Sequence, residues 1–222
     1  MAETLTDHRR RQMDFLLDAI ALNLPAKAPG GMSLRDVRLL AKTARANGDT
    51  PLTVAFETGE REDWVRFLLP FSDLTATDSS ENTLLIKATL KGDEAMARLF
   101  LPRSNPDQRG NLGKTALMHA VWHNNRALAE ILAPVSDPKT RCLFSRTALD
   151  WAIGKQACEC VDFLVEFYPM SDQELTELTR RFQTGELPRV MASLEARALR
   201  KELTQTGFGD SSPLVRRPAK SL

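Results

Sequence analysis

The sequence predicts an all-α fold, a solenoid of about four helix-turn-helix repeats with capping helices at both ends. Two separate residue patterns recur along the middle of the chain at a period close to 32 residues. Only 6% of the 222 residues are aromatic and eleven glycines are spread along the chain, which argues against an all-β fold. One pair of helices cannot bury its apolar face alone, whereas stacked neighbours can, so the repetition predicts a stack of helical pairs.

The first pattern is a Thr, a Leu two residues later and an Ala three residues after the Leu. The Thr hydroxyl can cap the first free amides of a helix, and the Leu and the Ala fall on one helical face. The pattern begins at Thr50, Thr83, Thr115 and Thr147, with spacings of 33, 32 and 32. Each Thr is therefore expected to begin the first helix of a unit.

The second pattern is Pro-x-Ser followed by Asp or Asn, and we expect it to end each unit. It begins at Pro70, Pro102, Pro134 and Pro169. Proline cannot continue the hydrogen-bond ladder of a helix, so it should stop the second helix. The Ser-Asp or Ser-Asn pair then favours a turn. Between the two patterns a break between helices is expected near Gly59, Gly92, Asn124-Asn125 and Gln156.

In combination these motifs resemble the ankyrin repeat, whose signature includes Thr-Pro-Leu-His-x-Ala. The Pro-x-Ser-Asp ending resembles a Leu-Pro-x-Ser-Asp variant associated with bacterial ankyrin proteins. The resemblance covers about residues 46–172. It departs from the family where Glu81 and Ser145 replace the glycine before the Thr, which leaves the local turn geometry open. The position of the signature His is filled by other residues, namely Thr53, Ile86, Met118 and Asp150.

The chain is divided accordingly. N-terminal capping helices are expected over residues 1–47, where residues 5–23 are amphipathic and Ser33 can cap a second helix. The repeats occupy residues 48–172, as 48–77, 78–109, 110–141 and 142–172. C-terminal capping helices follow over 173–205, opened by a capping box from Ser171 to Glu174. A disordered tail, rich in Gly, Ser, Pro and basic residues, is expected over 206–222.

Charge is distributed unevenly along the repeats. Residues 48–108 carry six basic and eleven acidic side chains, whereas residues 109–155 carry seven basic and three acidic ones. The resemblance implies a concave surface, made by the long turns and the outer positions of the first helices, that binds a protein partner. The basic part favours a partner with an acidic patch. The partner-binding residues expected on this surface are Lys91, Arg109, Lys114, Trp122, His123, Lys139, Arg141, Arg146, Trp151 and Lys155.

The three tryptophans have different expected roles. Trp64 lies beside apolar residues on a second helix, so it should pack in the core or on the convex side. Trp122 has two interpretations: an outward-facing hot spot, or a ring half-buried along a neighbouring repeat. Trp151 is expected to be mainly a packing residue. Nucleic acid is not expected as a partner because no basic–aromatic ladder is present to stack bases.

Candidate catalytic and metal-binding groups are few. His119 and His123 share a helix face, but the intervening residues lack the Glu of the zincin motif, and we interpret them as surface histidines. Cys158 and Cys160 are interpreted as small packing thiols. No Gly-rich phosphate loop and no nucleophile–base set can be assembled. We therefore expect no catalytic residues, no metal, no cofactor and no enzymatic activity.

The expected function is that of a protein-interaction module acting as a scaffold, inhibitor or regulator. The alternative is a bacterial secreted effector or counter-defence protein, translocated into a host cell, in which the repeats target and the terminal segments act. The sequence contains no long apolar run and no secretory signal pattern. Three cysteines fit a reducing compartment, so we expect a cytoplasmic protein that does not span a membrane. The oligomeric state is not indicated.

Overall fold

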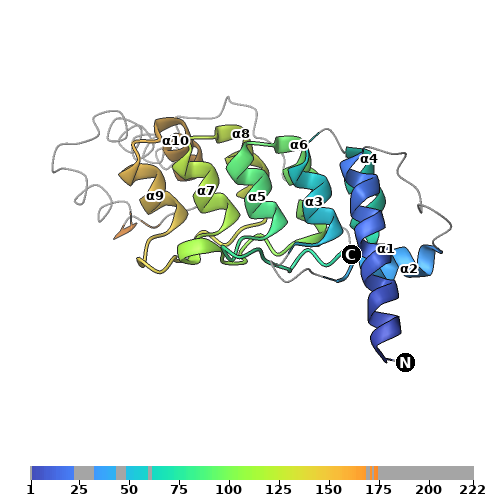
Figure 1. Cartoon of the computed structure of the whole chain (residues 1–222). Coiled ribbons are helices and arrows are strands. Elements are labelled where there is room, and N and C mark those ends of the chain that lie inside the picture. Colours follow the sequence, from blue (N-terminus) through green and yellow to red (C-terminus); the bar gives the residue numbers. More distant parts are fainter. Residues whose placement is uncertain are drawn as a thin grey trace, which may run out of the picture.

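The structure is a computed structural model that describes residues 2–22, 33–43, 49–59, 62–168, 171 and 173–174. All regular structure in these residues is helical, with one isolated antiparallel bridge between Thr77 and Thr83. The paired helices form two layers, a front layer and a second layer behind it (Figure 1). The front helices are α3 (Pro51–Glu57), α5 (Leu84–Lys91), α7 (Ala116–Trp122) and α9 (Ala148–Gly154), and their partners are α4 (Glu62–Leu68), α6 (Glu94–Phe100), α8 (Arg126–Leu132) and α10 (Cys158–Phe167). The predicted helical solenoid is therefore confirmed.

Each front helix begins at the predicted threonine. The side-chain oxygens of Thr50, Thr83, Thr115 and Thr147 each accept a hydrogen bond from the backbone N–H three residues later, at 3.2 to 3.4 Å. This satisfies one of the free amides at the start of each helix. The four caps place the front helices at equivalent positions in successive units.

The predicted breaks between the helices of each pair are present. Gly59, Gly92, Asn124 and Gln156 all have a positive φ, between 51° and 73°. Glycine adopts this left-handed backbone without steric cost, and Asn adopts it more readily than most residues. The same turn therefore forms in all four units although its residue type changes.

The turn before each capping threonine also keeps one geometry. Gly113 has φ 68°, and the two residues that replace glycine at this position, Glu81 and Ser145, have φ 62° and 57°. The substitutions therefore leave the left-handed turn in place and accept its steric cost, which is about 1–2 kcal/mol for a residue with a Cβ. Leu112, the neighbour of Gly113, is also left-handed, with φ 56°.

In the first two units the Pro-x-Ser ending closes the second helix in a different way from the expected stop; Pro169 of the fourth unit lies outside the described residues. Pro70 and Pro102 lie inside 3-10 turns, Leu69–Phe71 and Leu101–Arg103, that continue directly from α4 and α6. Proline fits there because the first positions of a helical turn do not require its N–H. The hydroxyls of Ser72 and Ser104 then donate to carbonyls four residues back, at 3.0 and 2.9 Å. The predicted turn follows, with Asp73, Asn105 and Asp137 side chains accepting from the backbone two residues on.

The core lies between the layers and between successive pairs. The Leu and the Ala of the first pattern are fully buried in the first three units, and in the fourth Ala152 is buried while Leu149 is partly buried. Trp64 is buried, as expected for a core residue. At one end, α1 (Ala2–Ala21) packs against α3 and buries Leu16 and Ile20. Next to it, α2 (Leu34–Leu40) begins at the predicted Ser33 cap, in a capping box with Asp36.

At the other end, the predicted capping box is present. The Ser171 hydroxyl oxygen accepts from the Glu174 N–H at 3.2 Å, and the Glu174 carboxylate accepts from the Ser171 N–H at 2.8 Å. The helices expected over the rest of 173–205 and the tail expected over 206–222 lie outside the described residues, as do residues 23–32 and 44–48. The proposed domain boundaries remain predictions.

Candidate functional site

Two tryptophans and three cations converge between α7 and α9. The ring centroids of Trp122 and Trp151 are 4.7 Å apart, with the ring planes at 65°. Lys114 Nζ lies 3.8 Å from the centroid of Trp122 and 4.3 Å from that of Trp151. Lys155 Nζ lies 3.6 Å from the Trp122 centroid, and Arg146 Cζ lies 4.9 Å from the Trp151 centroid. We call these five residues the tryptophan–cation cluster.

The repeat geometry brings the cluster together. Lys114 and Arg146 occupy the same position in successive units, directly before the capping threonines of α7 and α9. Trp122 is the last residue of α7, Trp151 lies in the middle of α9, and Lys155 forms the C-terminal cap of α9. The two helices lie side by side (Figure 1), so groups at both of their ends and on their facing surfaces meet.

The positive charge of the cluster is not neutralised by a neighbouring acid. In the part of the chain that the structure describes, no carboxylate oxygen lies within 4 Å of a nitrogen of the cluster's three cations. Lys87 on α5, in contrast, contacts the carboxylates of both Glu57 and Asp78. Lys114 is only 7% exposed, and burial together with repulsion from Lys155 lowers the pKa of its ammonium group. The cluster is thus a concentrated positive site held against aromatic faces.

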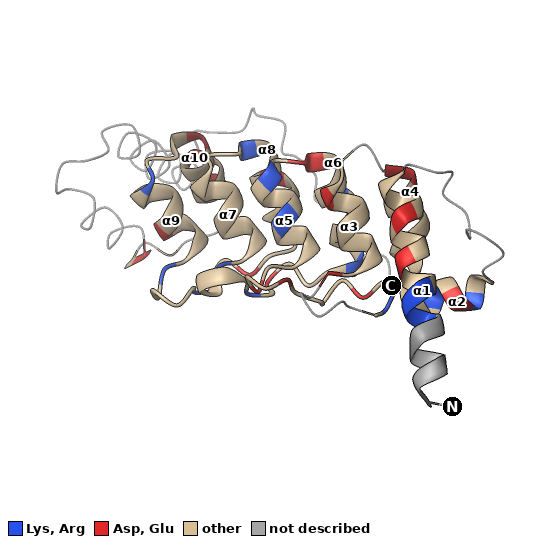
Figure 2. Ribbon diagram, viewed as in Figure 1, with Lys and Arg blue, Asp and Glu red and all other residues tan. Residues whose placement is uncertain are grey.

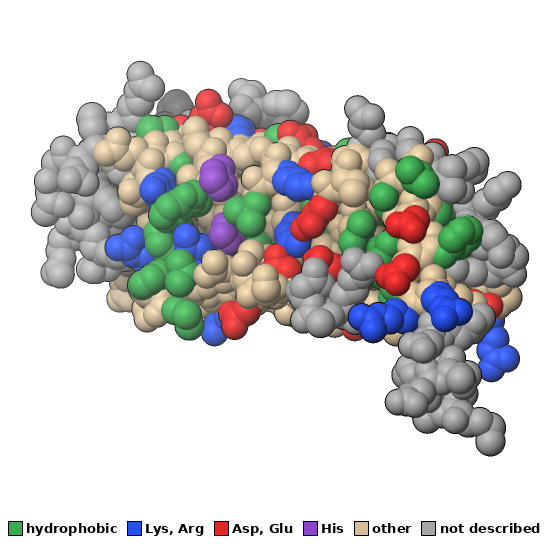
Figure 3. Space-filling view, viewed as in Figure 1, with side chains coloured by type: hydrophobic (Ala, Val, Ile, Leu, Met, Phe, Trp, Pro, Cys, Tyr) green, Lys and Arg blue, Asp and Glu red, His purple; other side chains and the backbone are tan. Residues whose placement is uncertain are grey.

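Large apolar side chains project from the long turns beside the cluster. Leu143 is 72% exposed, Phe144 is 56% exposed and Leu112 is 46% exposed. The Leu143 N–H donates to the Leu112 carbonyl oxygen at 3.1 Å, which joins the two turns. The Phe144 ring centroid lies 6.2 Å from that of Trp151. We call Leu112, Leu143 and Phe144 the apolar rim; Figure 3 shows hydrophobic and basic side chains gathered at this end of the array.

The other predicted binding residues divide into two groups. His123, Lys139, Arg141 and Arg109 are exposed and belong to residues 109–141, and Arg141 Nη1 donates to the Ser145 carbonyl oxygen at 2.6 Å. Lys91 is not part of this group, because its Nζ lies 4.3 Å from the Phe56 ring, between the first two units. In that half of the array α4 and α6 carry Asp and Glu residues (Figure 2).

Several expectations for single residues change. Lys114 and Trp151, both expected on the partner-binding surface, are each only 7% exposed, because they pack between the units; their contact with a partner stays a prediction. The Trp122 ring is partly buried against Trp151 of the neighbouring unit, as the second interpretation expects, and its role as a hot spot stays a prediction. The apolar rim was missed altogether. Its signal in the sequence is the pair Leu143-Phe144, two large apolar residues in a turn where polar residues are usual.

His119 is also placed differently from the expectation of a surface histidine. It is 8% exposed, and its Nε2 atom has no hydrogen-bond partner among the described residues. Burial, with smaller effects from the positive charges of Lys114 and His123, lowers its pKa to about 4. The imidazole is therefore neutral at physiological pH. His123, one turn later, is exposed and does not join it in a buried pair.

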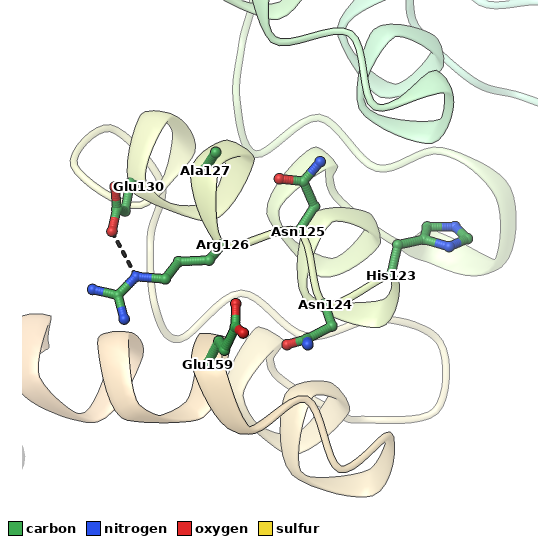
Figure 4. A pocket seen from close by; sticks show the side chains of 7 residues that line it. All are labelled: His123, Asn124, Asn125, Arg126, Ala127, Glu130 and Glu159. Carbon is green, nitrogen blue, oxygen red and sulfur yellow. Dashed lines mark hydrogen bonds and ion pairs between the residues drawn. The ribbon is translucent and has the colours of Figure 1, made fainter.

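A hollow of about 560 Å³ lies between the end of α7, the start of α8 and α10. It is lined mainly by polar side chains, among them Arg126, Glu130 and Glu159. The Arg126 side chain is held by Glu130, with Nε and Oε1 2.8 Å apart, and His123 points away from both carboxylates (Figure 4). Histidine and carboxylate thus do not converge on one point. The described residues also contain no group of three His, Cys, Asp or Glu side chains able to hold a metal ion.

Comparison with known proteins shows which repeat family the helical pairs resemble. Residues 65–142 match the family model of ankyrin repeats, in three copies. The match runs from α4 to the turn after α8, and so includes Lys114 and Trp122 but ends before α9. No curated protein matches the chain. With the observed helical pairs, this match confirms the predicted fold class, an all-α ankyrin-repeat solenoid.

Proposed function

We propose that this chain is a protein-interaction module that binds a partner protein on the face formed by the front helices and the long turns. Ankyrin repeats generally mediate protein–protein interactions and are typically not enzymes. The partner contacts the tryptophan–cation cluster and the exposed residues around it, and the bound chain acts as a scaffold, inhibitor or regulator. The observation that carries this proposal is the unneutralised cluster beside an exposed apolar rim.

The composition of this site is that of a binding hot spot. Trp and Arg are enriched among the interface residues that contribute most to affinity. Each cation–π contact stabilises its arrangement by about 0.5–2 kcal/mol, depending on how far the cation is desolvated. The cations are therefore held in position before the partner arrives, so little side-chain entropy is lost on binding.

The charge of the site supports a partner with an acidic surface. The cluster and the exposed Arg141 and Lys139 of the turn before α9 present positive charge, which accelerates encounter with an acidic protein and disfavours a basic one. Nucleic acid is the weaker candidate, because Lys114 and Lys155 already lie over the Trp122 ring, and Lys114 and Arg146 over the Trp151 ring. Bases that stack on a protein require free aromatic faces.

The test is quantitative affinity capture from extracts of the source organism, with identification by mass spectrometry. The bait is the full chain, compared with the double variant Arg146→Glu and Lys155→Glu, whose side chains are both exposed. The matched control is Arg35→Glu with Lys42→Glu, the same change of charge at the other end of the array. We expect the specifically captured proteins to be lost with the first variant and kept with the second. Equal capture by all three baits would refute the proposed site.

We also propose a cytoplasmic location. All three cysteines are free thiols, as expected in a reducing compartment. None of the described helices has the length and apolarity needed to cross a bilayer. The alternative function, an effector whose terminal segments act, depends largely on residues 175–222, which lie outside the described residues.

A further inference from the structure

We infer that the partner segment bound at this site is an extended acidic peptide in which one Asp or Glu stands one to three residues from a large apolar side chain. This inference rests on the proposed function and specifies the chemistry of the partner. Its two parts correspond to the two parts of the site. The carboxylate is received by the tryptophan–cation cluster, and the apolar side chain packs on the apolar rim.

The cluster is suited to one carboxylate. Three cations surround two tryptophan rings, and among the described residues none of the three has an acidic partner. Lys114 and Lys155 lie within 4 Å of the same Trp122 ring centroid, so their charges repel each other. A carboxylate bound next to these ammonium groups reduces their repulsion and forms charge-assisted hydrogen bonds. A neutral or basic segment would leave the repulsion in place.

The rim is suited to a large apolar side chain. Leu143 and Phe144 are among the most exposed apolar residues described, and they lie together with Leu112 at the junction of two turns. Exposed apolar side chains that cluster in this way mark interaction sites more often than single ones do. Covering them removes apolar surface from water, which favours binding of a Phe, Leu, Met or Trp side chain.

The spacing between the acidic and the apolar residue of the peptide follows from two distances measured from the Trp151 ring. Its ring centroid lies 6.2 Å from that of Phe144 and 4.3 Å from Lys114 Nζ. The Phe144 ring centroid and Lys114 Nζ are therefore at most about 10.5 Å apart, which is roughly three residues of an extended chain at about 3.3 Å per residue. A carboxylate and an apolar side chain within three residues of each other can thus occupy both parts together.

A peptide fits this site better than a membrane surface. Exposed Leu and Phe beside basic residues can also dock on an anionic bilayer. However, Lys114 is 7% exposed and lies between the rings of two helices rather than at the tip of the turns. A planar surface can reach the rim but not this ammonium group, whereas a single side chain of a narrow segment can reach both.

The experiment is selection from a random dodecapeptide library displayed on phage, using the immobilised full chain at a salt concentration of about 50 mM, where attraction is weakly screened. Peptides that also bind the Arg146→Glu, Lys155→Glu variant are removed. We expect the enriched sequences to carry Asp or Glu within three residues of Phe, Leu, Met or Trp. Enrichment of sequences without acidic residues, or no enrichment, overturns the inference.

The highest-ranking peptide is then synthesised and its Kd measured by isothermal titration calorimetry. We expect Arg146→Glu with Lys155→Glu to weaken binding by at least about tenfold, as for loss of charge-assisted contacts. Leu143→Ser with Phe144→Ser should weaken it by a similar factor, and Arg35→Glu with Lys42→Glu should change it less than about twofold, because exposed charges far away are screened. All four residues replaced in the first two variants are exposed, so both variants should remain folded, and circular dichroism checks this. Equal Kd values for all variants overturn the inference.

Two further measurements exclude the other occupants. Sedimentation with vesicles containing phosphatidylserine should leave the chain in the supernatant, and light scattering should show no dimer whose formation depends on Lys155. Either positive result overturns the peptide inference. If capture of a whole protein depends on Arg146 and Lys155 but the library yields no acidic–apolar peptides, the interaction module stands and only the inference fails. If neither depends on these residues, both fail.

Discussion

Replacing His119 with Met should remove a large part of the pH dependence of stability between about pH 6.5 and pH 4. In the folded chain burial lowers the pKa of His119 to about 4, whereas an unfolded histidine has a pKa of about 6.5. Between these values the unfolded chain binds a proton that the folded chain does not. The stability is therefore complete above about pH 6.5 and is lost progressively as the pH falls towards the folded pKa.

The magnitude follows from the size of the shift. A difference of about 2.5 pKa units corresponds to about 3 kcal/mol, at about 1.4 kcal/mol per unit. His119 is 8% exposed and Nε2 has no partner, so little solvent is available to reduce this cost. Protonation would place a charge beside the cluster cation Lys114, in a site that already holds unneutralised positive charge.

The assay is urea unfolding followed by far-ultraviolet circular dichroism at several pH values from 7 to 4. The quantity of interest is the difference in unfolding free energy between wild type and His119→Met, since contributions of the carboxylates cancel in it. We expect this difference to change by about 3 kcal/mol over the range. The matched control is His123→Met, which removes an exposed imidazole one turn away. The difference in unfolding free energy between wild type and this control should change much less over the same range. Parallel stability curves for wild type and His119→Met would refute the reasoning.

Three further predictions concern the repeat backbone and core. Glu81→Gly and Ser145→Gly should each raise the unfolding free energy by up to about 1 kcal/mol. Glycine removes left-handed backbone strain of about 1–2 kcal/mol and adds a smaller entropic cost. Replacement by Ala at either position keeps the Cβ and should not stabilise the fold. Gly113→Ala should lower the melting temperature, because φ is 68° and the new Cβ would lie 3.0 Å from a backbone nitrogen. Leu117→Asp should abolish the helical signal by burying a charge, whereas Leu90→Asp on an exposed position of α5 should retain it.

The local structure of each unit could be predicted from the sequence because it depends on a few neighbouring residues. The threonine caps bond within three residues, and the turn after each front helix requires one left-handed residue. The turn before each capping threonine persists even where Glu81 and Ser145 replace glycine, because the packing of the units on both sides outweighs a local strain of about 1–2 kcal/mol. The periodicity alone thus predicted the stack of helical pairs.

The candidate site was predicted only in part. Of the ten expected binding residues, the cluster unites Lys114, Trp122, Arg146, Trp151 and Lys155, while Lys91 lies in another part of the array. Mapping onto a repeat pattern assigns each residue a position within its own unit. It does not say which side chains of adjacent units touch, nor how deeply they are buried.

Residue order was thus sufficient for the caps, the left-handed turns and the number of helical pairs, since these arise from contacts within a few residues. Stacking decided the rest. The packing of α7 against α9 joined two tryptophans 29 positions apart, buried His119 and Lys114, and left Leu143 and Phe144 uncovered. Burial and cation–π contact depend on the distance and rotation between neighbouring units, and these are set by the packing of whole helices rather than by any local motif.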